Sequence, residues 1–97
     1  MVVCSIYTSR EEVFKALQVF LKEREYHHIV ADANTYSISA QRKDSFFSKK
    51  YSVRFIVRSK TATISDIEIT VNPLHASSTR ADARQEDKIR SRIYFYF

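Results

Sequence analysis

The stretch YSVRFIVRSKTATISDIEITV, residues 51–71, decides the fold of this chain. Apolar and polar residues alternate in its first half, which predicts a β-strand with one buried face. The buried face would consist of Tyr51, Val53, Phe55 and Val57. Arg54 and Arg58 would lie on the opposite face. A turn near residues 59–61 leads to a second β-prone segment, so the stretch predicts an antiparallel hairpin.

The second half of this stretch changes the parity of its apolar positions. Ala62 and Ile64 alternate on one face, whereas Ile67, Ile69 and Val71 continue on the other. A β-bulge near Ser65 and Asp66 would add one residue and restore the facing. We expect Pro73 to end the sheet region, because proline cannot donate a ladder hydrogen bond.

Upstream, residues 2–8 are β-prone and a helix-start signal follows them. Ser9 and Glu12 form the S-x-x-E pattern of a capping box. Apolar residues then recur at helical spacing on one face, namely Val13, Phe14, Leu17, Phe20 and Leu21. The spacing predicts an amphipathic helix over roughly residues 9–25, with Val19 on its outward side.

Between this helix and the central hairpin, the pattern predicts a second β-hairpin. A short apolar strand after Tyr26 reaches a turn at residues 32–35, and alternation then resumes. One face would carry Tyr36, Ile38 and Ala40, and the other would carry Ser37, Ser39 and Gln41. The polar segment 42–50 forms the next connection. Its Phe46 and Phe47 could tuck under the sheet or stay exposed.

The C-terminal segment fits two structures. As a helix, it stacks Ile89, Ile93 and Phe97 on one side, with a start signal at Ser78 or Thr79. As a strand, it would set Ile89, Ser91, Ile93, Phe95 and Phe97 on one face against Arg90, Arg92, Tyr94 and Tyr96 on the other. We favour the helix, because a second helix would help to cover one face of the sheet. The prediction is a single α+β domain over residues 1–97, with an antiparallel four- to five-stranded sheet and the order β-α-β-β-β-β-α.

Composition excludes several classes of function. The chain has no glycine, and both the Walker loop and the dinucleotide fingerprint need glycine where the backbone approaches phosphate. We therefore expect no nucleotide cofactor, and we expect Asn or Asp at positions of positive φ. The single cysteine, Cys4, cannot form an internal disulfide. No signal peptide or long apolar run is visible, so the default location is the cytoplasm, or the bacterial envelope if a leader was removed.

No motif for catalysis or metal binding stands out. His27 and His28 are adjacent, so on a strand their side chains would point to opposite faces. Cys4 and His75 are far away in the sequence. We expect no enzyme activity, no metal and no other cofactor. An enzyme remains a third hypothesis, which a pocket uniting Cys4, a histidine and a carboxylate would revive.

The run SREEVFKALQVFLKEREYHHIVADANTYSISAQR, residues 9–42, resembles small bacterial envelope domains with a TATA-binding-protein-like or helix-grip fold. These domains include the repeats of the outer-membrane assembly lipoprotein BamC. The resemblance rests on S-x-E-E-V-F at residues 9–14, on I-x-A-x-R at residues 38–42, and on the hairpin that follows. It extends to about residue 71, although these domains carry glycine in the turn where this chain has Asn34. The resemblance implies a scaffold or binding module with no catalytic residues.

Positive charge is concentrated in one segment. Residues 42–60 contain seven basic residues and one acidic residue, a net charge of +6 against +5 for the whole chain. The candidate binding surface consists of Arg42, Lys43, Lys49, Lys50, Arg54 and Arg58. Basic residues near aromatic ones are typical of nucleic-acid binding, but they also keep a solvated sheet from aggregating.

These patterns favour a small non-enzymatic interaction module or scaffold, whose sheet or sheet edge binds a protein partner. The alternative is a basic nucleic-acid-binding protein that uses the 42–60 segment. The ending IYFYF, residues 93–97, adds a homodimer as a further hypothesis, since it places four aromatic residues at one terminus.

Overall fold

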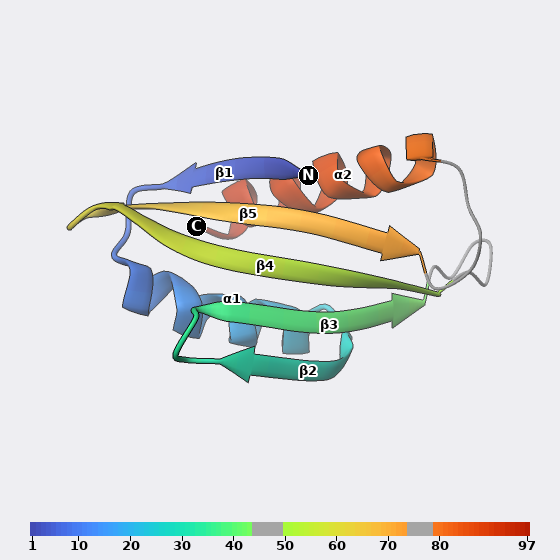
Figure 1. The fold of residues 1–97 in the computed structure, drawn as a ribbon, viewed down its shortest axis with the longest axis horizontal. Coiled ribbons are helices and arrows are strands. Elements are labelled where there is room, and N and C mark those ends of the chain that lie inside the picture. Colours follow the sequence, from blue (N-terminus) through green and yellow to red (C-terminus); the bar gives the residue numbers. More distant parts are fainter. Residues whose placement is uncertain (44–49, 74–78) are drawn as a thin grey trace.

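The computed structural model describes residues 1–43, 50–73 and 79–97. It confirms the α+β fold and the order β-α-β-β-β-β-α. The elements are β1 (Val2–Ile6), α1 (Arg10–Glu23), β2 (His27–Asp32), β3 (Ser37–Lys43), β4 (Lys50–Thr61), β5 (Ile64–Pro73) and α2 (Thr79–Tyr96). All neighbouring strands are antiparallel, in the order β1-β5-β4-β3-β2. The edges of the sheet are therefore β1 and β2 (Figure 1).

The hairpin of β4 and β5 forms as the alternation predicted, and it lies between β1 and β3 in the sheet. Phe55 is fully buried and pairs with the equally buried Ile69. Arg54 and Arg58 are exposed on the other face. Pro73 is the last residue of β5, which confirms the predicted end of the sheet region.

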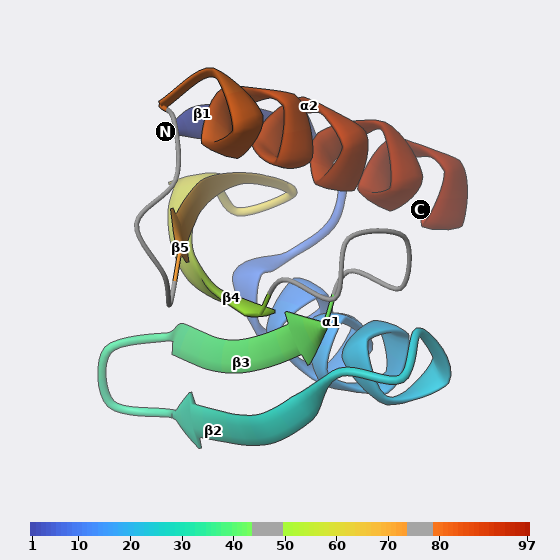
Figure 2. The same cartoon turned by 90° about the vertical axis from the view of Figure 1, so that its right-hand side faces the viewer.

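Both helices cover the same side of the curved sheet (Figure 2). The five predicted apolar residues of α1 are all buried, and Val19 is exposed as expected. The C-terminal segment is a helix, and its Ile89 and Ile93 join the same core. α1 packs against β2, β4 and β5, whereas α2 packs against β1 and β5. The opposite face of the sheet carries no helix among the described residues.

The bulge near Ser65 and Asp66 is not present, and this prediction was wrong. Ser65 itself occupies a core position, where it is fully buried and its hydroxyl donates to the carbonyl of Thr8 at 2.7 Å. This hydrogen bond satisfies the buried hydroxyl, so a polar residue fits the buried face. The irregularity lies instead in β4, between Ser59 and Thr61.

Two local predictions were also wrong. Ser9 is the N-cap residue of α1, but its side chain makes no capping hydrogen bond; its carbonyl accepts the N–H of Val13 at 2.9 Å. Within residues 1–43, 50–73 and 79–97, positive φ occurs not at Asn or Asp but at Glu25 (63°), His28 (51°) and Tyr36 (50°). Tertiary contacts outweigh the intrinsic preference there, since the carbonyl of Tyr36 accepts the N–H of Val57.

Glu25 has a separate structural reason, because α1 ends in a Schellman motif. The N–H of Tyr26 donates to the carbonyl of Leu21 at 3.0 Å, and that of Glu25 donates to the carbonyl of Lys22 at 3.2 Å. This motif requires a left-handed residue, most often glycine, at the position of Glu25. No helix within the described ranges has the length and apolarity to span a membrane.

Candidate functional site

The arginines of β4 lie on the uncovered face of the sheet, among acidic side chains. Arg58 Nε lies 3.1 Å from Glu68 Oε2, and Arg58 is opposite Asp66 in the register of β4 and β5. Asp66 in turn accepts a hydrogen bond of 2.6 Å from Ser5 Oγ. Because positive and negative groups alternate across the strands, this face is of mixed charge and not a basic surface.

Arg42 lies on the opposite, helix-covered side of the sheet. Its strand neighbour Ala40 is buried, and alternation places Arg42 on the same face. The guanidinium lies 5.3 Å from the centre of the Tyr26 ring, and Arg42 pairs with Tyr51 in register. Burial lowers the pKa of Arg42, but its contacts with Tyr26 and Tyr51 outweigh this and leave the pKa raised.

Tyr51, which lies next to Arg42, also has a shifted pKa. Burial, and then the neighbouring Tyr26, raise the pKa of Tyr51 well above its usual value. Tyr51 therefore stays neutral beside Arg42.

The predicted basic surface is thus divided. Arg54 and Arg58 share the uncovered face, whereas Arg42 lies on the other. Lys43 and Lys50 are opposite each other in the register of β3 and β4, and Lys49 is outside the described residues. The described arginines do not converge on one site.

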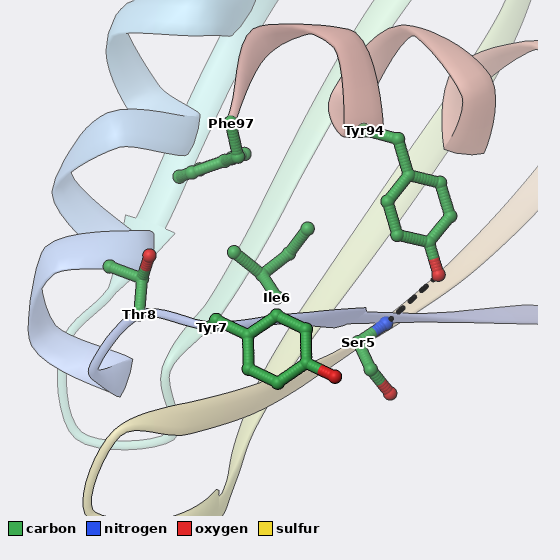
Figure 3. A pocket seen from close by; sticks show the side chains of 6 residues that line it. All are labelled: Ser5, Ile6, Tyr7, Thr8, Tyr94 and Phe97. Carbon is green, nitrogen blue, oxygen red and sulfur yellow. Dashed lines mark hydrogen bonds between the residues drawn. The ribbon is translucent and has the colours of Figure 1, made fainter.

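A pocket of about 210 Å³ lies where β1 meets the end of α2 (Figure 3). Ser5 and Ile6 come from β1, Tyr7 and Thr8 from the loop that follows, and Tyr94 and Phe97 from the C-terminal segment. Ile6 forms the floor between the rings of Tyr94 and Phe97, and the Tyr7 ring stands beside it. The walls are therefore mainly aromatic.

Tyr94 links the helix to the edge of the sheet. Its hydroxyl accepts a hydrogen bond from the backbone N–H of Ser5 at 3.3 Å. Since β1 is an edge strand, this N–H would otherwise point to solvent. The same hydroxyl contacts the buried thiol of Cys4, whose pKa is raised by burial and lowered in part by this contact.

Aromatic side chains in the loop after β1 and in the C-terminal segment are unusually exposed. The exposed fraction is 95% for Phe95 and 86% for Tyr7. Tyr96 is held between neighbours, with ring centres 5.4 Å from Phe20 and 5.5 Å from Phe97. We call this surface the aromatic end; it consists of Tyr7, Tyr94, Phe95, Tyr96 and Phe97.

Cys4 carries the thiol nearest to this pocket, in the strand that supplies Ser5 and Ile6. Cys4 is buried, and its raised pKa keeps the thiol protonated at neutral pH. Across the described ranges, His, Cys, Asp and Glu do not gather into groups of three or more that could hold a metal ion. Sequence reasoning noted the aromatic ending but missed the pocket, because its two halves are about ninety residues apart.

Neither a protein-family model nor any curated protein matches this sequence.

Proposed function

We propose that this protein is a non-enzymatic interaction module that binds a protein partner through the aromatic end. The observation that carries the proposal is the pocket between Tyr7, Tyr94 and Phe97, together with the almost fully exposed Phe95 that follows Tyr94 in the chain. Large apolar groups gathered on a surface mark interaction sites more often than scattered ones do. Tyr and Phe are also enriched at the centres of interfaces.

The size and lining of the pocket suit one bulky apolar side chain. An apolar cavity of about 150 Å³ is large enough to bind benzene, and this pocket is larger. An inserted ring would contact Ile6 and the three aromatic walls, as in the anchor pockets that dominate binding energy. The partner we propose is therefore a protein that presents an aromatic or large aliphatic side chain.

The alternative, a nucleic-acid-binding protein, has less support. Its sequence argument needs the arginines of the 42–60 segment on one surface, but Arg42 faces the helices while Arg54 and Arg58 face away from them. The uncovered face also carries Asp66 and Glu68. A titration with single- and double-stranded nucleic acid at two salt concentrations tests this reading. Strong, salt-dependent binding would favour it over ours.

A peptide-display selection against the full chain tests the proposed site. We expect enriched peptides with a shared aromatic or large aliphatic residue, whose affinity falls at least about tenfold for Tyr7→Ser, the loss typical of an interface anchor. Tyr7 is largely exposed, so this change should leave the fold intact. Val19→Ser on α1, another exposed apolar position, is the matched control. Peptides that bind Tyr7→Ser and the original chain equally would contradict the proposal.

A further inference from the structure

The two edges of the sheet are not equally covered. Along β1, α2 packs beside the strand, and Tyr94 accepts the outward N–H of Ser5. Along β2, every residue is at least partly exposed. We propose that β2 is a dimerisation edge, where β2 of one copy pairs antiparallel with β2 of a second copy to form one continuous sheet.

The backbone register shows which groups of β2 are available. The N–H of Val57 donates to the carbonyl of Tyr36, so β3 directs Tyr36 and every second residue after it toward β4. Ser37 and Ser39 therefore point toward β2, where they pair with Asp32 and Val30. It follows that the N–H and C=O of Ala31 point away from the sheet. They are free to pair with another strand.

The irregularity between His27 and Val30 sets the register of this pairing. It bends the strand before Val30, so that only residues 29–32 offer a regular edge. A two-fold axis at Val30 places Ala31 of each copy opposite Ile29 of the other. This arrangement pairs the outward backbone groups of both strands, which is the pattern of strand addition.

The side chains of β2 complement each other only in the antiparallel direction. One end of the strand carries His27 and His28, and the other carries Asp32. An antiparallel pair brings the imidazole N–H donors of one copy to the carboxylate of the other at both ends. A parallel pair would instead place histidine beside histidine and carboxylate beside carboxylate. The carboxylate already accepts the N–H of Asn34 at 2.9 Å, and it has further acceptor capacity.

Val30 provides the apolar centre of the contact. Its exposed fraction is 66%, which is high for a β-branched residue in a strand. On the axis it would meet the same residue of the second copy, and cross-strand pairs of this kind stabilise sheets. No Lys or Pro, the usual blockers of edge pairing, occurs in β2.

The covered β1 edge explains why the assembly would close at two copies. A sheet with two free edges can add copies indefinitely, but here only one edge is free, so the contact is two-fold and self-limiting. A strand pair this short buries less than the ~1,200 Å² of a standard interface. We therefore expect a dimer that forms with rising concentration and not a permanent one.

The test measures mass and backbone protection together on the full chain. By sedimentation equilibrium, the mass should rise from the 11.4 kDa of the monomer toward twice that value as concentration increases. By NMR hydrogen exchange, the amide of Ala31 should become slower to exchange over the same range, while that of Ser5 should not change.

Two β2 variants and two comparison variants complete the test. Ala31→Pro removes the outward N–H and should abolish both effects; Val30→Lys should do the same and serves if Ala31→Pro does not fold. Val19→Lys, at an exposed valine on α1, should dimerise normally, and so should Phe95→Ser. A monomer at all concentrations overturns the proposal, and so does dimerisation that Phe95→Ser abolishes and Val30→Lys does not.

Discussion

The two edge strands of this sheet, β1 and β2, differ in how far a helix covers them. On the β1 side of the sheet, α2 packs against β1 and β5, and its side chains accept backbone N–H groups from both strands: Tyr94 that of Ser5 in β1, and the buried Glu86 that of Val71 in β5. α1 contacts β2 as well, but every residue of β2 stays at least partly exposed, and the strand is irregular near His28. The difference teaches that protecting an edge takes a long, well-packed element.

Loosening α2 should have the largest effect, because it uncovers the β1 edge. Ile93 is fully buried, and Ile93→Ala should lower the free energy of unfolding by about 3 kcal/mol, the usual effect of such a truncation in a core. Urea denaturation measures this loss. Cys4 supplies a local probe, since burial raises its pKa and hides it in β1. Its rate of alkylation at neutral pH should therefore increase in the variant.

Hydrogen exchange in the same variant tests whether α2 supports the β1 edge or the whole sheet. If β2 amides lose protection from exchange in Ile93→Ala as early as those of β1, then α2 supports the whole sheet and not one edge.

Removing the buried carboxylate should come next. Glu86 accepts the N–H of Val71 at 2.9 Å and lies 2.8 Å from the amino group of Met1. Glu86→Ala leaves that N–H without its acceptor, so we expect a loss of about 2 kcal/mol in urea denaturation. Asp87→Ala is the matched control on the next residue, because Asp87 is exposed and its carboxylate pairs with Arg90 on the surface. Equal losses in both variants would mean that the cover of the β1 edge does not depend on Glu86.

The hydroxyl of Tyr94 should contribute less. Tyr94→Phe keeps the ring in the pocket wall and removes the acceptor for Ser5. Since the hydrogen bond is 3.3 Å long and exposed, we expect a loss of about 0.5 kcal/mol. The specific measurement is the exchange rate of the Ser5 amide, which should increase. An unchanged rate would show that the packing of α2, and not this hydroxyl, shields the edge.

A change on the open edge should have the smallest effect on stability. Val30 contacts solvent more than protein, so Val30→Lys should change the free energy of unfolding of the monomer by less than about 0.5 kcal/mol. Urea denaturation at low protein concentration measures this value without a contribution from association. A loss as large as that of Glu86→Ala would mean that β2 is part of the cooperative core and is not an independent edge.

The sequence predicted what short-range pattern controls. The alternation in residues 51–57 and the helical spacing in 13–21 placed the strands, α1 and most of the core correctly. The C-terminal segment fitted two periods because Ile89 and Ile93 satisfy both, and its packing against β1 and β5 selects the helix. The bulge was misplaced because the pattern put Ile64 on the buried face, whereas Ser65 occupies that face and donates its hydroxyl to the carbonyl of Thr8.

The candidate site was harder to predict for a related reason. Net charge along a segment says nothing about which face each side chain takes. The sequence analysis therefore assigned Arg42 and Arg54 to one basic surface, although the register of β3 and β4 places them on opposite faces of the sheet. The pocket depends on contacts between residues 5–8 and residues 94–97, and no local pattern encodes such a contact. The resemblance to envelope domains remains an expectation about the fold family and its role.

At the end of α1, one position could be substituted to make the fold more stable. Glu25 occupies the left-handed position of a Schellman motif with an ordinary side chain, at a conformational cost of roughly 1 kcal/mol that glycine would not incur. The residue is exposed and belongs to neither the aromatic end nor β2. A glycine at this position, whether engineered or selected at high temperature, would therefore stabilise the fold without altering either proposed contact surface.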